Sequence, residues 1–311
     1  MRAFVTGATG FIGANLVRRL LEYGYEVHVL IRPESKRWRI EDILSNLHLH
    51  EGDLQTADFN HIFTTSQPDV IFHLGVFGAY QFQTEPRQIL ETTVFGTLRL
   101  LQAAKQSGVK ILVAAGSSSE YGTKQHPMHE DELVEPNTYY AIGKVTQTHL
   151  CQHFSRVEKL PTVSLRLFSV YGPYEEPGRL VPTLIRKSFA NEALEMADPS
   201  IARDYIYVDD VIDAFMVAAD HPEYSGEVFN VGTGEQTCLR DIVAQVLRLT
   251  GSNSGVNWGA YAQRSFDTSI WVADTVKVYR NLGFRAQHSL EDGLRKTINW
   301  FNANNKYHAT T

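Results

Sequence analysis

The chain contains few of the residues that mark secreted, metal-binding or membrane-spanning proteins. Its 311 residues include only two cysteines, Cys151 and Cys238, which lack the close spacing of a metal site. So few cysteines are typical of a reducing compartment. No apolar run approaches the roughly 18 residues that cross a bilayer. The strand-like start over residues 1–6 leaves no room for a signal peptide. We therefore expect a cytoplasmic protein without a membrane segment.

An excess of positive charge is also absent. The chain has 29 Lys and Arg against 35 Asp and Glu, which gives a formal net charge of -6. Nucleic acids and anionic membranes attract basic proteins, so this balance argues against both partners. The hydrophobic fraction of 43% and the charged fraction of 21% are ordinary for a globular protein. The composition indicates a globular protein of enzyme size.

What the first half of the chain does contain is a regular alternation of short apolar runs and longer amphipathic segments. The runs at 27–31 and 70–72 are nearly all apolar, as in strands that helices cover on both faces. This alternation predicts an α/β fold with a Rossmann-type, doubly wound parallel sheet. The expected strands are 3–5, 26–31, 47–50, 70–73, 110–114 and 162–167, and the expected helices are 11–23, 85–107 and 140–158.

After residue 168 the pattern becomes irregular. Proline and glycine interrupt a loop, and short helical and strand-like pieces follow to the end of the chain. We expect a Rossmann domain over 1–168, to which some later segments return. A smaller C-terminal α/β domain over 169–311 would bind the substrate.

A glycine-rich loop lies between the first predicted strand and the first predicted helix. Its spacing is Gly-x-x-Gly-x-x-Gly. Such glycines allow a tight turn and let backbone N–H groups approach a pyrophosphate at a helix N-terminus. No Gly-Lys-Ser/Thr follows, which argues against a nucleoside-triphosphate loop. The loop predicts dinucleotide binding through Gly7, Thr9, Gly10, Phe11, Ile12 and Gly13.

The residue at the tip of the second predicted strand indicates which dinucleotide binds. An acid there would bind the ribose hydroxyls of NAD, but this chain has Arg32, with Lys36 and Arg37 close behind. A guanidinium pairs with a 2′-phosphate, so we predict NADP. NAD stays an alternative because Glu34 could serve the ribose hydroxyls. Asp53, just after the third predicted strand, is placed to meet the adenine amino group.

Tyr140 and Lys144 form a candidate catalytic pair. Tyr140 is the one tyrosine of 14 with a lysine four residues later, and this spacing puts both on one helix face. A phenol has an ordinary pKa near 10, and a neighbouring cation favours its phenolate. Tyr140 could then exchange a proton while a hydride moves to or from a nicotinamide. Ser117, at the end of a predicted strand, offers a hydroxyl to the same substrate oxygen. We call Ser117, Tyr140 and Lys144 the catalytic trio.

Together with other motifs in the same order, these residues resemble the extended short-chain dehydrogenase/reductase family of nucleotide-sugar epimerases, dehydratases and reductases. The resemblance implies that Ser117 occupies the catalytic Ser/Thr position, that Lys144 also holds the nicotinamide ribose, and that Leu54 and Leu74 lie at the cofactor. It further implies a nucleotide-diphosphate sugar as substrate. The matching stretches are 6–13, 52–54, 73–74, 116–122, 140–144, 166–173 and 203–210.

Within that family, two features bear on the reaction. The dehydratases carry Asp-Glu directly after the catalytic Thr, whereas this chain has Ser118 and Ser119, so we reject dehydration. The segment 116–122 looks most like the family's reductases of nucleotide-linked 4-keto-6-deoxy sugars, and Arg32 stands where epimerases usually keep Asp. We therefore expect an NAD(P)-dependent reductase, with a 4-epimerase that retains NAD as the alternative. The intact catalytic trio argues against a non-catalytic dinucleotide-binding regulator.

The resemblance also implies where the substrate binds. Arg203 and Arg264 match positions of arginines that bind the diphosphate, and guanidinium groups bind phosphate oxygens bidentately. Ser169 replaces an asparagine that touches the sugar diphosphate in relatives. The loop 76–80 follows the fourth predicted strand at its carboxyl end, where ligands bind in such sheets. The predicted substrate contacts are Phe77, Tyr80, Ser118, Ser119, Ser169, Arg203 and Arg264.

Two further expectations concern metals and assembly. His149 and His153 have i,i+4 spacing, which can bind zinc, but no carboxylate or third ligand accompanies them, so we predict no metal. The helices over 85–107 and 140–158 form a dimer interface in many relatives, and the resemblance therefore implies a homodimer.

Overall fold

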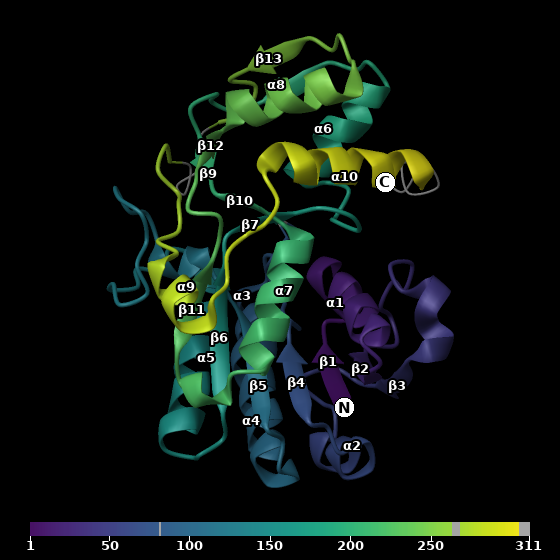
Figure 1. Cartoon of the computed structure of the whole chain (residues 1–311), viewed down its shortest axis with the longest axis vertical. Helices are drawn as coiled ribbons and strands as arrows, with labels where there is room; N and C mark the ends of the chain where they lie inside the picture. Colours follow the sequence, from purple (N-terminus) through teal and green to yellow (C-terminus); the bar gives the residue numbers. More distant parts are fainter. Residues whose placement is uncertain (81, 263–267, 305–311) are drawn as a thin grey trace.

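The computed structural model describes residues 1–80, 82–262 and 268–304, and within them it confirms the predicted Rossmann-type sheet (Figure 1). The main sheet has seven strands in the order β11-β6-β5-β4-β1-β2-β3, all parallel. The strands are β1 (Arg2–Thr6), β2 (Glu26–Ile31), β3 (His48–Glu51), β4 (Val70–His73), β5 (Ile111–Ser117), β6 (Thr162–Leu167) and β11 (Val228–Val231).

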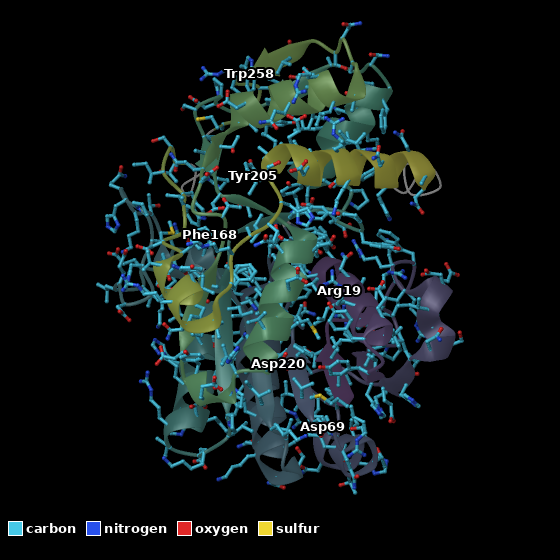
Figure 2. The ribbon with its side chains drawn as sticks, in the orientation of Figure 1. Arg19, Asp69, Phe168, Tyr205, Asp220 and Trp258 are labelled. Carbon is cyan, nitrogen blue, oxygen red and sulfur yellow. The ribbon has the colours of Figure 1, made fainter. Side chains whose placement is uncertain are left out.

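Helices cover both faces of this sheet because its strands are apolar on both sides. Ala3 and Val5 of β1 belong to the core beneath α1 and α7, whereas Phe4 between them belongs to the core beneath α2, α4 and α5. An ion pair of Arg19 on α1 with Asp213 on α7 joins the first pair of helices. Figure 2 labels Arg19. These helices are α1 (Phe11–Glu22), α2 (Phe59–Ser66), α4 (Gly96–Ser107), α5 (Tyr139–Arg156) and α7 (Val208–Ala219).

The single helix predicted over 85–107 is interrupted in the structure. It consists of α3 (Pro86–Leu90), a π-helical turn η2 (Glu91–Phe95) and α4. Gly96 packs so tightly that a Cβ there would lie 2.8 Å from the Leu54 Cβ. The Thr97 hydroxyl donates to the Thr93 carbonyl at 2.5 Å. The wide turn therefore lies where the helix meets the segment after β3, which is typical of π-helical turns near ligand sites.

The C-terminal half forms a smaller α/β region, drawn above the main sheet in Figure 1. Some later segments join the sheet: β11 pairs with β6, and α7 packs on the sheet. The boundary at residue 168 stays a prediction. The other elements are β7 (Ser169–Tyr171), β8 (Leu194–Met196), β9 (Ala202–Arg203), β10 (Tyr205–Tyr207), β12 (Thr237–Cys238), β13 (Val256–Trp258), α6 (Leu180–Phe189), α8 (Leu239–Thr250), α9 (Val276–Leu282), α10 (Leu290–Ala303), η1 (Glu41–Asn46), η3 (Ser118–Tyr121) and η4 (Pro222–Tyr224).

Among the described residues, no helix combines the length and the apolar character needed to cross a membrane.

The packing of α1 against the glycine loop gives a first prediction. A Cβ on Gly13 would lie 2.1 Å from the Gly7 carbonyl oxygen, whereas a Cβ on Gly255 would meet nothing within 4 Å. Helix propensity alone would make Gly13→Ala stabilising by about 1 kcal/mol. We expect the clash to dominate and to lower the free energy of unfolding by about 1–3 kcal/mol in chemical denaturation. Gly255→Ala, the control, should stay within about 0.5 kcal/mol of the parent protein. A stabilised Gly13→Ala protein would contradict this packing.

Candidate active site

The glycine loop lies at the carboxyl end of β1, where the sequence predicts the dinucleotide. Gly7 has a φ of +76°, and a Cβ there would lie 2.7 Å from the Leu74 carbonyl carbon at the end of β4. Gly10 is the N-cap residue of α1, and no side chain caps that helix end. The first-turn N–H groups, which include those of Phe11 and Ile12, are thus left for a ligand. The loop has the shape that a pyrophosphate requires.

A buried hydrogen-bond chain fixes the end of β1 to β4 and α4. The Gly75 N–H donates to the Thr6 Oγ1 (3.0 Å), and the Thr6 hydroxyl bonds the His73 Nδ1 (2.8 Å). The His73 Nε2 bonds the Thr97 Oγ1 (2.9 Å), which itself donates to a helix carbonyl. Burial, with the charge of Lys144, lowers the pKa of His73 to about 3. The ring is therefore neutral, and Thr6, His73 and Thr97 each have one donor role and one acceptor role. His73 lies in the stretch 73–74 that matches the family, but the resemblance implied no such role for it.

The predicted adenosine contacts lie side by side at the ends of β2 and β3. The Arg32 Nη1 is 4.0 Å from the Asp53 Oδ2, and the Arg32 Nε is 3.4 Å from the Glu34 Oε1. Asp53 also accepts the Gln55 N–H at 2.8 Å. Leu54 is buried against the glycines Gly75 and Gly96. The Arg32 guanidinium, 42% exposed, therefore stands between two carboxylates.

The structure brings the catalytic trio together at the carboxyl end of β5. Ser117 ends that strand, and Tyr140 lies in the first turn of α5, which Thr138 caps by accepting the Ala141 N–H. Burial raises the pKa of the Tyr140 phenol. A hydrogen bond with the Ser117 side chain and the charge of Arg179 act in the opposite direction. Ser117 and Tyr140 are thus adjacent, as a shared substrate oxygen requires.

Lys144 is buried one helical turn after Tyr140, with only 2% of its surface exposed. Its Nζ donates to the Ala115 carbonyl (2.7 Å) and to the Gln147 Oε1 (3.2 Å). The ammonium group therefore lies against β5, the strand that ends at Ser117. Burial lowers the pKa of Lys144 to about 8, although the charge of Glu120 opposes this change.

Glu120 holds Ser117 in place and was not predicted as a site residue. Its Oε1 accepts the Ser117 N–H (2.9 Å), and its Oε2 accepts the Arg166 Nε and the Thr148 hydroxyl, both at 2.9 Å. In return the Ser117 Oγ accepts the Ser119 N–H at 3.2 Å, which completes a capping box. The sequence signal was present, because Ser-x-x-Glu is the pattern of such a box.

Ser118 and Arg203 meet at Trp271, a residue that the sequence did not indicate. The Trp271 Nε1 donates to the Ser118 Oγ at 3.0 Å, and Ser118 is buried. The Arg203 guanidinium lies 5.0 Å from the centre of the Trp271 ring and donates to the Ala202 carbonyl. Ser169 begins β7, where its N–H donates to the Asp204 carbonyl. Arg264 lies outside the described residues.

The loop after β4 lies beside the trio. Phe77 and Tyr80 are both half-buried, and burial raises the pKa of Tyr80. The Tyr80 ring stacks on Phe82 with centroids 5.5 Å apart. Tyr80 lies close enough to Tyr140 for their charges to interact. The loop therefore borders the place where the sugar of a substrate would meet Tyr140.

A segment that follows β7 crosses back to the glycine loop, and we call residues 172–179 the strap. The Arg39 Nε donates to the Tyr174 carbonyl (2.7 Å), and the Arg39 Nη1 donates to the Thr9 carbonyl (3.4 Å). The Asn15 side chain of α1 donates to the Pro173 carbonyl (3.1 Å). Tyr174 has a φ of +68°, which is uncommon for a residue with a side chain. These bonds fasten the strap over the dinucleotide loop, and no motif pointed to Arg39.

The strap also brings ionisable groups to the site. Burial raises the pKa of Glu175 to about 8, against the charges of Arg179 and Arg39, so its carboxyl group is mostly protonated at neutral pH. Arg179, at the end of the strap, is exposed and acts on the phenol of Tyr140. The strap thus offers one cation that acts on Tyr140 and one neutral acid that acts on Tyr80.

The buried ion pair of Glu120 with Arg166 gives a second prediction. Removing one partner leaves a buried charge alone, which typically costs about 3–5 kcal/mol. We expect Glu120→Ala to lower the free energy of unfolding by about that amount in chemical denaturation. The control is Glu91→Ala, which removes the exposed pair with Arg87 and should cost at most about 1 kcal/mol. Equal losses in the two variants would show that the buried pair does not support the site.

Comparison with known proteins agrees with this geometry. The sequence profile of the NAD dependent epimerase/dehydratase family matches residues 3–232. The UDP-glucose 4-epimerase of Mycolicibacterium smegmatis is 32% identical over 317 residues, covering 97% of this chain and 98% of that protein.

Solved structures give the same result. The UDP-glucose 4-epimerase of Thermotoga maritima, crystallised with UDP-glucose, has a TM-score of 0.90 and 28% identity, covering 98% of this chain and 99% of that chain. The UDP-glucuronic acid 4-epimerase of Bacillus cereus, in complex with UDP-glucuronic acid and NAD, has a TM-score of 0.85 and 28% identity, covering 97% and 99%. These relatives are named as epimerases rather than as the 4-keto-6-deoxy-sugar reductases that the motifs favoured. Because the family profile covers most of the chain, the protein belongs to the NAD dependent epimerase/dehydratase family.

Proposed function

We propose that the protein is a nucleotide-sugar 4-epimerase that keeps NAD bound through its catalytic cycle. NAD in the dinucleotide site would accept a hydride from the sugar carbon and return it to the opposite face. Tyr140 takes the proton of the sugar hydroxyl in the first half of the cycle and gives it back in the second. Ser117 donates a hydrogen bond to the same sugar oxygen, and Lys144 supplies positive charge beneath the reacting groups.

The strap is the observation that carries this proposal. An epimerase must hold its reduced cofactor until the hydride has returned, whereas a reductase must exchange its cofactor in every turnover. Arg39 binds both the Tyr174 carbonyl of the strap and the Thr9 carbonyl of the glycine loop. A cofactor between them could leave only after these bonds break. The strap therefore supports retention, and the epimerase names of the relatives agree with it.

The residues next to Ser117 argue against the removal of water. Elimination needs an acid and a base near the sugar, and the chain has Ser118 and Ser119 there. The Ser118 hydroxyl accepts from Trp271, and the Ser119 hydroxyl pairs with that of Ser117 at 2.8 Å. Both hydroxyls serve packing or orientation of the trio.

For the cofactor, the surroundings of Arg32 favour NAD over the NADP that the sequence predicted. A 2′-phosphate would have to approach between the carboxylates of Glu34 and Asp53. Their charges offset that of the guanidinium, whereas ribose hydroxyls could donate to either carboxylate. The second candidate remains an NADPH-dependent reductase of 4-keto-6-deoxy sugars, which the exposed guanidinium of Arg32 favours.

We also propose that the protein forms a homodimer through η2 and α5. Phe95, Tyr139 and Ile142 expose 59%, 53% and 41% of their surface on these elements. Apolar side chains gathered on neighbouring helices are typical of subunit interfaces.

The function is tested by incubating the purified protein with UDP-glucose, UDP-glucuronic acid or UDP-N-acetylglucosamine without added cofactor. We expect inversion at C4 of one of these sugars, followed by NMR, and release of NAD from the denatured protein. Tyr140→Phe should lower turnover by about 10²–10⁴-fold because it removes the proton carrier. The neighbouring Tyr139→Phe is the matched control and should keep its activity. Net oxidation of added NADPH by a keto sugar, without inversion of any sugar, would instead identify the reductase.

The pKa of Lys144 predicts the pH dependence of this activity. Its value of about 8 means that the ammonium charge is present below that pH and is lost as the pH rises through it. We expect kcat/KM to fall about tenfold per pH unit above this value, since the phenolate of Tyr140 then lacks its cation. Lys144→Arg stays charged throughout and should lose this alkaline limb, even at a lower overall rate. An unchanged limb in Lys144→Arg would assign it to another group.

A further inference from the structure

A cluster of histidines lies at the outer edge of the main sheet, apart from the catalytic trio. Glu26 and His28 lie on β2, and His48 and His50 lie on β3, the edge strand; we call these four residues the histidine cluster. His28 and His48 are direct neighbours across the two parallel strands. Because side chains alternate along a strand, Glu26 shares a face with His28, and His48 shares one with His50. The proposed function uses none of these residues.

Three of these side chains bring ligand atoms close together. The Glu26 Oε1 lies 3.0 Å from the His28 Nε2 and 3.8 Å from the His48 Nε2. One ligand atom from each of the three residues lies within 4.8 Å of the others. Zinc with bonds of about 2.0–2.1 Å needs ligand atoms about 3.3 Å apart. The observed spacing brackets that value, so side-chain rotations suffice to close the site.

His50 provides the support that a metal-binding histidine usually has. The His28 Nδ1 bonds the His50 Nε2 at 3.0 Å, and the two rings are stacked with centroids 5.3 Å apart. A ligating histidine commonly donates its second ring N–H to a neighbour, which fixes the ring and its tautomer. With the His28 Nδ1 proton directed to His50, the His28 Nε2 keeps its lone pair for an ion beside Glu26.

The mobility of the ligands also fits an ion that binds at the surface. The rings of His28 and His48 are stacked with centroids 4.6 Å apart, so His48 must turn before its lone pair faces the same point. Its side chain is 59% exposed and can do so, whereas that of His28 is held in the sheet at 8%. Arg2 lies opposite Glu26 on β1, and its guanidinium donates to Gln67. Water can fill the fourth position.

We propose that Glu26, His28 and His48 form a binding site for one divalent transition-metal ion of the Zn²⁺, Co²⁺ or Ni²⁺ type. Two imidazoles and one carboxylate are ligands that these ions prefer, whereas Mg²⁺ and Ca²⁺ prefer oxygen alone. The ion joins β3 to β2 and so holds the edge of the sheet. The site differs from the pair His149 and His153 on α5, which contact Gln152 and Glu158 respectively.

The test uses the full chain, free of any affinity tag and stripped with EDTA. Titration with ZnCl₂ in a calorimeter should show one ion per chain, and CoCl₂ should give the visible absorption of a low-symmetry four-coordinate site. His48→Gln should weaken binding by at least about 100-fold, and His50→Gln by about 10-fold. His153→Gln, a matched histidine outside the cluster, should bind like the parent protein.

The exposed position of His48 keeps the test decisive, because its replacement leaves the sheet intact where that of buried His28 could disturb folding. Thermal unfolding of each variant without metal checks this point. Zinc should raise the melting temperature of the parent protein and of His153→Gln, and EDTA should reverse the rise. Equal affinity in the parent protein and in His48→Gln would overturn the proposal, as would the absence of binding at millimolar ZnCl₂.

Discussion

The candidate active site depends on one buried carboxylate, that of Glu120. It accepts hydrogen bonds from the Ser117 N–H at the end of β5, from Arg166 on β6 and from Thr148 on α5. The carboxylate of Glu120 thus binds residues of β5, β6 and α5, the three elements that carry or flank the catalytic trio. A buried carboxylate is tolerated only when its partners satisfy it, so this arrangement fixes the positions of all three elements together. The same charge keeps the pKa of buried Lys144 from falling further.

Much of the sheet could be predicted from the sequence because apolar runs reveal strands that are covered on both faces. The predicted strands 26–31 and 162–167 coincide with β2 and β6. Local pattern could not show α2, a short helix over Phe59–Ser66, or the interruption of the helix over 85–107. The π-helical turn there directly precedes the close contact of Gly96 with Leu54, which are distant in sequence. Likewise β11 is a strand of the main sheet only because β6 offers it an edge.

Some residues of the candidate site could likewise be predicted from the sequence, and others could not. The positions of the glycine loop and of the pair Tyr140 and Lys144 could be predicted because the proposed chemistry requires fixed residue types at fixed spacing along one element. Ser117 was indicated instead by its place at the end of a predicted strand. Arg39 and Trp271 were not, since each acts on residues far away in the chain, Thr9 and Tyr174 for the first and Ser118 for the second. The surroundings of Arg32 could not be predicted for a related reason. Arg32 is visible in the sequence, but the approach of Asp53 follows from the pairing of β2 with β3.

The strap has a consequence for the lifetime of each molecule under the proposed function. An enzyme that cannot exchange its cofactor cannot discard a hydride either. If the keto sugar dissociates before the hydride returns, the enzyme retains a reduced cofactor that no bound sugar can oxidise. The enzyme molecule is then inactive. The bonds from Arg39 and Asn15 to the strap would then determine how soon such a molecule exchanges its cofactor and recovers. A strap held tightly over the glycine loop therefore limits loss of the cofactor. It also prolongs the inactive state that follows each dissociation of the keto sugar.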